Sequence, residues 1–184
     1  MKKFLITSAI VILSLSFCLF IYLNVKVGIG SNTNKLVIEQ FNDIFKESSQ
    51  EISDEDIIDL PKLQLNGTDY VGIISVEDFE LVLPVQSICN NSFFDAVSAC
   101  NYTSDVFTIL GTNLKNSFNS YNSFNENDKV IFTNTIGKIF EYRIKKIKRV
   151  DEITNISQYS DADLIIIVKN YYDMNYVLFI CESY

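Results

Sequence analysis

Histidine is absent from all 184 residues of the chain. That absence excludes catalysis by Ser-His or Cys-His pairs, zinc sites of the HExxH type and histidine general bases. No two of the four cysteines are spaced as CxxC, so zinc ribbons and thioredoxin-like sites are excluded as well. Enzymes that depend on an imidazole or on a paired thiol therefore fall outside the functions open to this protein.

Positive charge is also scarce. The chain has 15 Lys and Arg against 23 Asp and Glu, for a net charge of −8. An acidic chain is a poor match for nucleic acid, so no nucleic-acid partner is expected. The acidic group Glu77, Asp78 and Glu80 is too local in sequence to form a metal cage. We expect neither a metal nor another cofactor.

The longest uncharged stretch is Phe4–Val25, which directly follows Lys2 and Lys3. As a helix, its 22 residues would extend about 33 Å, enough to cross a hydrocarbon core of about 30 Å. The lysine pair favours a cytoplasmic N-terminus. A cleaved signal peptide is the alternative, but no clear small-x-small exit follows Tyr22. Residues 1–25 are therefore expected to be a signal-anchor transmembrane helix of a single-pass plasma-membrane protein, with the rest extracytoplasmic.

Residues 26–62 are expected to form a helical stalk and an acidic linker. Val27–Asn34 is a link rich in Gly, Ser and Asn, and Lys35–Ser48 has apolar residues at helical spacing. Glu51–Asp59 is a run of acidic charge, which is usually solvated.

From residue 63 to residue 184, short apolar runs between polar turns predict a β-domain. Leu164–Val168 is a continuous β-branched and apolar run, typical of a strand that is buried on both faces. Asn170–Asn175 is a polar break, and Tyr176–Cys181 is a second apolar run. The two runs predict a hairpin at the centre of the domain.

Cys89 and Cys100 are 11 positions apart in this domain. In an extracytoplasmic segment they could form a disulfide, which contributes about 2–3 kcal/mol when unstrained. Two buried thiols are the other option, since spacing alone does not establish geometry. The sequence leaves this choice open.

A series of short motifs follows in a fixed order between residues 66 and 181. The motifs are the strand pair Tyr70–Ile74 and Leu81–Val85, the strand end Thr108–Asn113, the step Asn127–Ile131, the strand Gly137–Val150, and the pair Leu164–Lys169 and Asn175–Val177. Their order and spacing resemble those of sortases, the membrane-anchored cysteine transpeptidases of Gram-positive cell surfaces. The resemblance implies a mainly β, sortase-like closed barrel with short helices over residues 63–184.

The resemblance places other residue types where sortases carry their active-site His, Cys and Arg. Thr112 stands at the histidine position, Lys169 at the cysteine position and Asn175 at the arginine position. The family's reaction needs a thiolate nucleophile, a proton carrier and a fixed positive donor for the oxyanion. The resemblance therefore implies a protein without catalytic residues.

Two further residue assignments bear on that conclusion. Cys181 lies in an apolar run close to the C-terminus and is interpreted as a buried strand cysteine. Lys169 could act as a base in an apolar cleft, with Thr112 as the nucleophile. In the alternative, Lys169 reaches solvent and Thr112 makes a local hydrogen bond.

Three functions follow as hypotheses. The first is a membrane-anchored, extracytoplasmic, inactive sortase-like protein that binds a surface-protein sorting signal or an active sortase, as an accessory module in cell-surface protein anchoring. The second is an active transpeptidase or hydrolase that attaches surface proteins to the cell wall with non-standard residues. The third is a surface protein whose likeness to sortases is coincidental.

Overall fold

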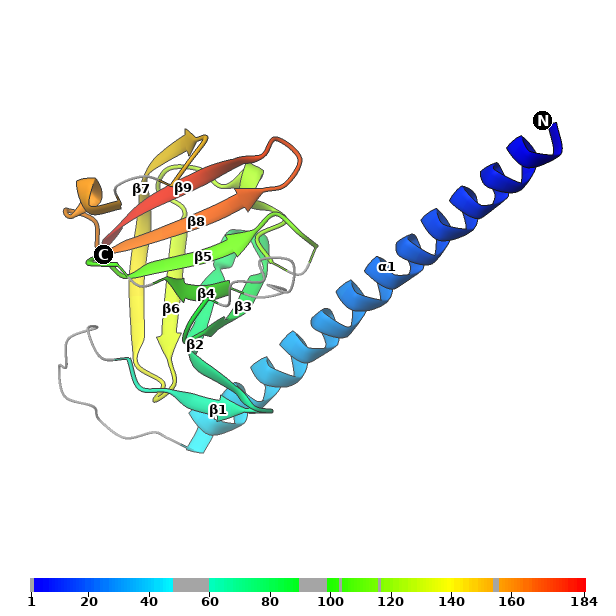
Figure 1. Cartoon of the computed structure of the whole chain (residues 1–184). Coiled ribbons are helices and arrows are strands. Elements are labelled where there is room, and N and C mark those ends of the chain that lie inside the picture. The colour runs from blue at the N-terminus through cyan, green and yellow to red at the C-terminus, as the bar shows by residue number, and fades with distance from the viewer. Residues whose placement is uncertain (1, 48–59, 90–98, 103, 116, 154–155) are drawn as a thin grey trace.

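The structure is a computed structural model, and it describes residues 2–47, 60–89, 99–102, 104–115, 117–153 and 156–184. A long N-terminal helix extends away from a β-barrel that contains the rest of the described chain (Figure 1). The acidic linker expected at Glu51–Asp59 lies outside the described residues.

Helix α1 runs without a break from Lys2 to Glu47. The link expected at Val27–Asn34 is therefore helical, and the separate helix expected at Lys35–Ser48 is the last part of α1. Each glycine costs a helix about 1 kcal/mol, but starting a second helix needs a new and unfavourable nucleus, so continuation is the cheaper outcome. Among the residues whose structure is described, no helix has a stretch that is both long and apolar enough to cross a lipid bilayer.

The C-terminal part of α1 packs on the barrel. Val37 and Phe41 are fully buried against Tyr70 and Ile73. The Phe41 and Tyr70 rings meet edge to face, with their centroids 6.3 Å apart. This contact attaches the helix to the start of strand β2.

Nine strands make up the sheet. They are β1 (Leu63–Leu65), β2 (Thr68–Val76), β3 (Leu81–Gln86), β4 (Ala99–Tyr102), β5 (Thr108–Thr112), β6 (Lys129–Asn134), β7 (Ile139–Val150), β8 (Leu164–Asn170) and β9 (Asn175–Ser183). Their order is β1-β2-β3-β4-β5-β8-β9-β7-β6, and β2 also pairs with β6. The sheet therefore closes into an eight-stranded barrel of β2 to β9, which confirms the closed barrel that the resemblance implies. Short 3₁₀ turns lie at η1 (Glu77–Phe79), η3 (Tyr121–Ser123) and η4 (Ile156–Tyr159).

Strand β2 closes the barrel because it has three partners along its length. Its start pairs with β1, its later part pairs with β6, and β3 runs along its other edge. Gly72 lies at the bulge where the partners change. A Cβ atom there would lie 2.2 Å from the Thr133 carbonyl oxygen, so only glycine permits this approach of β6.

The predicted hairpin is confirmed, since β8 and β9 are antiparallel neighbours with Val168 opposite Val177. Residues Leu164–Val168 are all fully buried, as expected for a strand covered on both faces. Their side chains alternate between two apolar clusters. Leu164, Ile166 and Val168 belong to the barrel interior, and Ile165 and Ile167 belong to a second cluster on the outer face.

The outer cluster is covered by the connection between β7 and β8. Ile156 of this connection is buried against the cluster, and Ile153 and Tyr159 pack beside it. At the other side of the cluster, Cys89 and Cys100 form a disulfide with 5.1 Å between their Cα atoms. The structure thus has the bonded form of the two that the sequence left open.

Candidate functional site

Thr112 and Lys169 are direct neighbours in the sheet. Strands β5 and β8 are parallel, and these two residues are paired across the ladder at their C-terminal ends. Paired residues of parallel strands point to the same side. Because Leu110 and Ile167, two positions back on each strand, belong to the outer cluster, Thr112 and Lys169 share the outer face of the barrel.

Asn175 is not brought onto that face. It pairs with Asn170 at the start of β9, and its neighbour Tyr176 pairs with Lys169. Side chains alternate along a strand, so Tyr176 lies on the outer face and Asn175 on the inner one. The structure therefore joins two of the three residues that the resemblance singles out, and Tyr176 is the β9 residue beside them.

Two tyrosines surround the ammonium group of Lys169. Its Nζ atom lies 5.0 Å from the ring centre of Tyr171 and 5.9 Å from that of Tyr176. Ring faces attract cations at such distances, so the two rings help to hold the ammonium group in place. Burial, and to a smaller degree Tyr176, raises the pKa of Tyr171 above its ordinary value, which keeps that phenol protonated. Neither tyrosine was among the site residues predicted from the sequence.

Thr112 is held by local contacts. Its side chain is fully buried, and its Oγ1 accepts a hydrogen bond from the Leu114 backbone N–H at 3.4 Å. Its own N–H donates to the Ser117 Oγ at 3.1 Å, and the Phe118 N–H donates to its carbonyl at 2.9 Å. The preceding residue, Gly111, has no room for a side chain, because a Cβ there would lie 2.4 Å from the Phe118 ring. A hydroxyl enclosed in this way is out of reach of a peptide bond.

A network of asparagines fixes the same end of β5 and β8 from the inner side. Asn113 donates through Nδ2 to the Oδ1 of Asn170 at 2.8 Å, and Asn170 donates to Asp173 at 2.7 Å. The backbone N–H of Tyr171 donates to the Asn113 Oδ1 at 3.2 Å. The Oδ1 of Asn175 is buried without a hydrogen bond. Asparagines recur at the ends of β5, β8 and β9, and this recurrence is the pattern in the sequence from which the network could have been predicted.

The cysteines of the described part of the barrel are either enclosed or bonded to each other. Cys181 is fully buried in the interior, and desolvation raises its pKa from 9.0 to about 12. Cys89 and Cys100 are bonded to each other. The remaining cysteine, Cys18, lies exposed on α1. Among the described residues no group of three or more acidic, cysteine or histidine side chains is placed to hold a metal ion.

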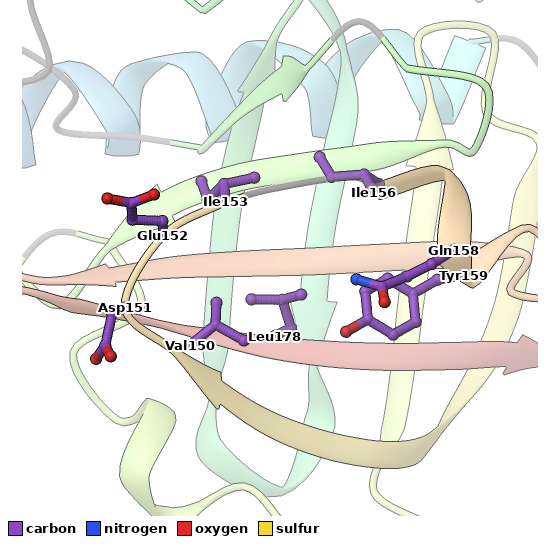
Figure 2. A pocket seen from close by; sticks show the side chains of 8 residues that line it. All are labelled: Val150, Asp151, Glu152, Ile153, Ile156, Gln158, Tyr159 and Leu178. Carbon is purple, nitrogen blue, oxygen red and sulfur yellow. The ribbon is translucent and has the colours of Figure 1, made fainter.

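A pocket of about 440 Å³ opens beside this face, between the β7–β8 connection and β9 (Figure 2). It is lined by Val150, Asp151, Glu152, Ile153, Ile156, Gln158, Tyr159 and Leu178. Leu178 and Ile156 are also members of the outer cluster, so the pocket lies on the same face as Thr112 and Lys169. The sequence did not predict this pocket, because the β7–β8 connection has few apolar residues and its pattern indicates a polar crossover.

Comparisons with other proteins give a consistent fold. By sequence, the chain matches no family model and no curated protein. By structure, it is similar to a Clostridium perfringens sortase D5 transpeptidase, with a TM-score of 0.55, 15% identity and coverage of 85% of this chain and 99% of the other.

Two similar structures hold peptides. Clostridium perfringens sortase C with its C-terminal cell wall sorting motif has a TM-score of 0.53 and 12% identity, covering 86% of this chain and 88% of the other. Sortase E1 from Streptomyces coelicolor with a tripeptide in the active site has a TM-score of 0.52 and 14% identity, covering 62% and 88%. Likeness at this identity concerns the fold rather than the activity. The chain has a sortase-like fold.

Proposed function

We propose that this protein is a catalytically inactive, sortase-like module that binds an extended peptide on the outer face of β5 and β8. The observation that carries this proposal is the state of its cysteines. A sortase reaction needs a thiolate that reaches the peptide, whereas Cys181 is enclosed with a raised pKa and Cys89 and Cys100 are bonded to each other. No cysteine of the described barrel is fit for that role.

The residues at the ends of β5 and β8 support the same conclusion. The Thr112 hydroxyl is fully buried, so it is unsuited to attack a bound peptide. The Lys169 ammonium lies near two tyrosine rings, and the hydroxyl that would have to serve as its nucleophile is the enclosed one of Thr112. The pair therefore lacks an accessible nucleophile.

Peptide binding is supported by the surface that remains. Beside Lys169 are the half-buried rings of Tyr171 and Tyr176, and Tyr172 at the hairpin tip is 86% exposed. Tyrosines of this kind are common at recognition sites, since each offers a large apolar area and a polar end. The sortases that hold a sorting motif and a tripeptide have the same fold. The expected ligand is a surface-protein sorting signal, and an active sortase is the alternative partner.

The test separates binding from turnover. The full chain is incubated with a fluorogenic peptide that carries a cell wall sorting motif, with hydroxylamine as the acceptor, while anisotropy of a labelled copy reports binding. We expect saturable binding without cleavage or hydroxamate formation. Tyr176→Ser is expected to weaken binding by about five- to thirtyfold, as loss of an aromatic contact of about 1–2 kcal/mol would.

Val82→Ser is the matched control, because it changes a 41% exposed residue of β3 outside this face. It is expected to leave binding unchanged. Turnover that Lys169→Ala abolishes would show an active enzyme with non-standard residues and would contradict the proposal. A peptide that binds the Tyr176→Ser variant as well as the unaltered chain would contradict the placement of the site.

We also propose that the protein is held in the plasma membrane by residues 1–25, with the barrel outside the cytoplasm. The proposal is supported by the uncharged run Phe4–Val25 and by Lys2 and Lys3 before it. In cell fractionation, the full chain is expected in the membrane fraction and released only by detergent. A chain that salt or alkali extracts would contradict an integral anchor.

A further inference from the structure

The pocket beside β9 is apolar in its middle and differs at its two ends. In Figure 2, Ile153 and Ile156 form one wall, and Val150 and Leu178 form the other. The carboxylates of Asp151 and Glu152 lie toward one end, while Tyr159 and Gln158 lie at the opposite end. A volume of about 440 Å³ is within the range of ligand pockets.

Within the described part of the chain, neither of these two carboxylates has a hydrogen-bond or ion-pair partner. Both residues are exposed, and neither takes part in an ion pair or side-chain hydrogen bond within the described chain. Each therefore remains available to a cation that enters the pocket from solvent. Figure 2 shows the two carboxylates directed to different sides at the rim, and both are exposed, so each would attract such a cation with the modest strength of a surface ion pair.

At the opposite end of the pocket, Tyr159 already contacts a cation of the protein, the ammonium group of Lys148. Lys148 donates from Nζ to the Tyr159 hydroxyl at 3.2 Å, and it lies 4.7 Å from the centre of that ring. A second positive charge at this end would be repelled. The charge arrangement therefore gives the pocket a direction, with the cation of a ligand at Asp151 and Glu152.

We propose that this pocket takes the side chain of a lysine or arginine from the bound peptide. The proposal rests on the peptide-binding function above and adds the class of residue that is selected. Such side chains place an aliphatic stem along apolar surface and keep the charged head in a polar setting. The stem lies between Ile153 and Leu178, and the head lies at Asp151 and Glu152.

This occupant fits better than the two obvious competitors. A purely aliphatic side chain would fill the middle of the pocket but leave both carboxylates without a counterion. An acidic side chain would be repelled by Asp151 and Glu152 at one end, and only Lys148, already bonded to Tyr159, could attract it at the other. A basic side chain is the one class that uses the apolar walls and the charged end together.

The test uses probes small enough to report on the pocket alone. The full chain, labelled at its Ile, Leu and Val methyl groups, is titrated with Nα-acetyl-lysine methylamide and with the norleucine analogue, which has the same stem without the ammonium group. The lysine probe is expected to shift the methyl signals of Ile153, Ile156 and Leu178, and to bind about three- to tenfold more tightly than norleucine, as one or two partly exposed ion pairs allow.

The double variant Asp151→Asn, Glu152→Gln should remove the preference for lysine while keeping the affinity for norleucine. Its matched control is Glu77→Gln, Asp78→Asn, which removes the same charge from the exposed turn η1 and should keep the preference. Because screening weakens exposed pairs, added salt should reduce the preference in the unaltered chain and in this control, but should change nothing in Asp151→Asn, Glu152→Gln.

Three outcomes would overturn the inference: norleucine binding as tightly as lysine, a lysine probe that shifts none of the pocket methyls, or a preference that survives the double variant. The proposed function fails by a different result. If the sorting-motif peptide does not bind while the lysine probe does, the pocket is correctly assigned and the peptide function is wrong. If the peptide binds with no preference for a basic residue, the function stands and the pocket assignment is wrong.

Discussion

The inner and outer faces of β8 are equally buried, but they are closed by different kinds of structure. Ile166 faces the barrel interior, where hydrogen-bonded strands surround the packed core. Ile167 faces the outer cluster, whose cover is the β7–β8 connection with Ile156 and its neighbours. One strand thus has a face enclosed by ladders and a face covered by a loop.

The features on which the proposed peptide binding depends lie on the outer face, which the β7–β8 connection covers. Lys169, its two tyrosines and the pocket with Asp151 and Glu152 are all on the outer side. A ladder of strands resists local opening, while segments with few backbone partners open at low cost. A peptide site on the outer face, as proposed above, would leave the interior undisturbed when a peptide binds.

The largest difference between the two faces should be in the stability lost when one isoleucine on each face is replaced by alanine. Ile166→Ala is expected to destabilise the fold by about 3–5 kcal/mol, since closed strands cannot move into the space left. Ile167→Ala is expected to cost about 2–3 kcal/mol, because the β7–β8 connection can settle onto the smaller side chain. Urea unfolding of the full chain, followed by near-ultraviolet circular dichroism, measures both.

The matched control is Val82→Ala, an exposed position at which the change should stay within about 0.5 kcal/mol. Equal losses at Ile166 and Ile167 would mean that the connection is as rigid as the barrel. In that case the outer face would adjust to a smaller side chain no better than the inner face does.

The sequence predicts the strands better than it predicts which face a side chain takes. The run Leu164–Val168 and its hairpin are visible because continuous apolar stretches and polar breaks are local signals. The face of Asn175 is not, because a shift of one residue in register moves a side chain to the other side of the sheet. The resemblance set Asn175 at the arginine position but did not say which β9 residue pairs with Lys169, and in the ladder that residue is Tyr176.

The pocket and the continuity of α1 were missed for reasons of a different kind. Ile153 and Ile156 are two apolar residues in a polar segment, and only their contact with Leu178, far along the chain, gives them a role. The glycines within α1 suggested a break, but helix propagation outweighs their propensity. Both cases depend on cooperativity or long-range packing, which local patterns do not record.

The smallest effect that sharpens the comparison is a pH dependence that the Cys181 thiol of the inner face should produce. Desolvation raises the pKa of the Cys181 thiol from 9.0 to about 12. The unfolded chain therefore loses this proton first. The stabilising effect of the enclosed thiol is complete below pH 9 and is lost as the pH rises through the folded value. Between about pH 8 and about pH 10, the free energy of unfolding should fall by about 1 kcal/mol from this group. Cys181→Ala should remove this contribution and leave only the smaller slope from buried phenols such as Tyr142, whose pKa burial also raises, whereas Cys18→Ser, a change on the exposed surface of α1, should keep the full slope. A slope that is as steep in Cys181→Ala as in the unaltered chain would show that the enclosed thiol is not its source.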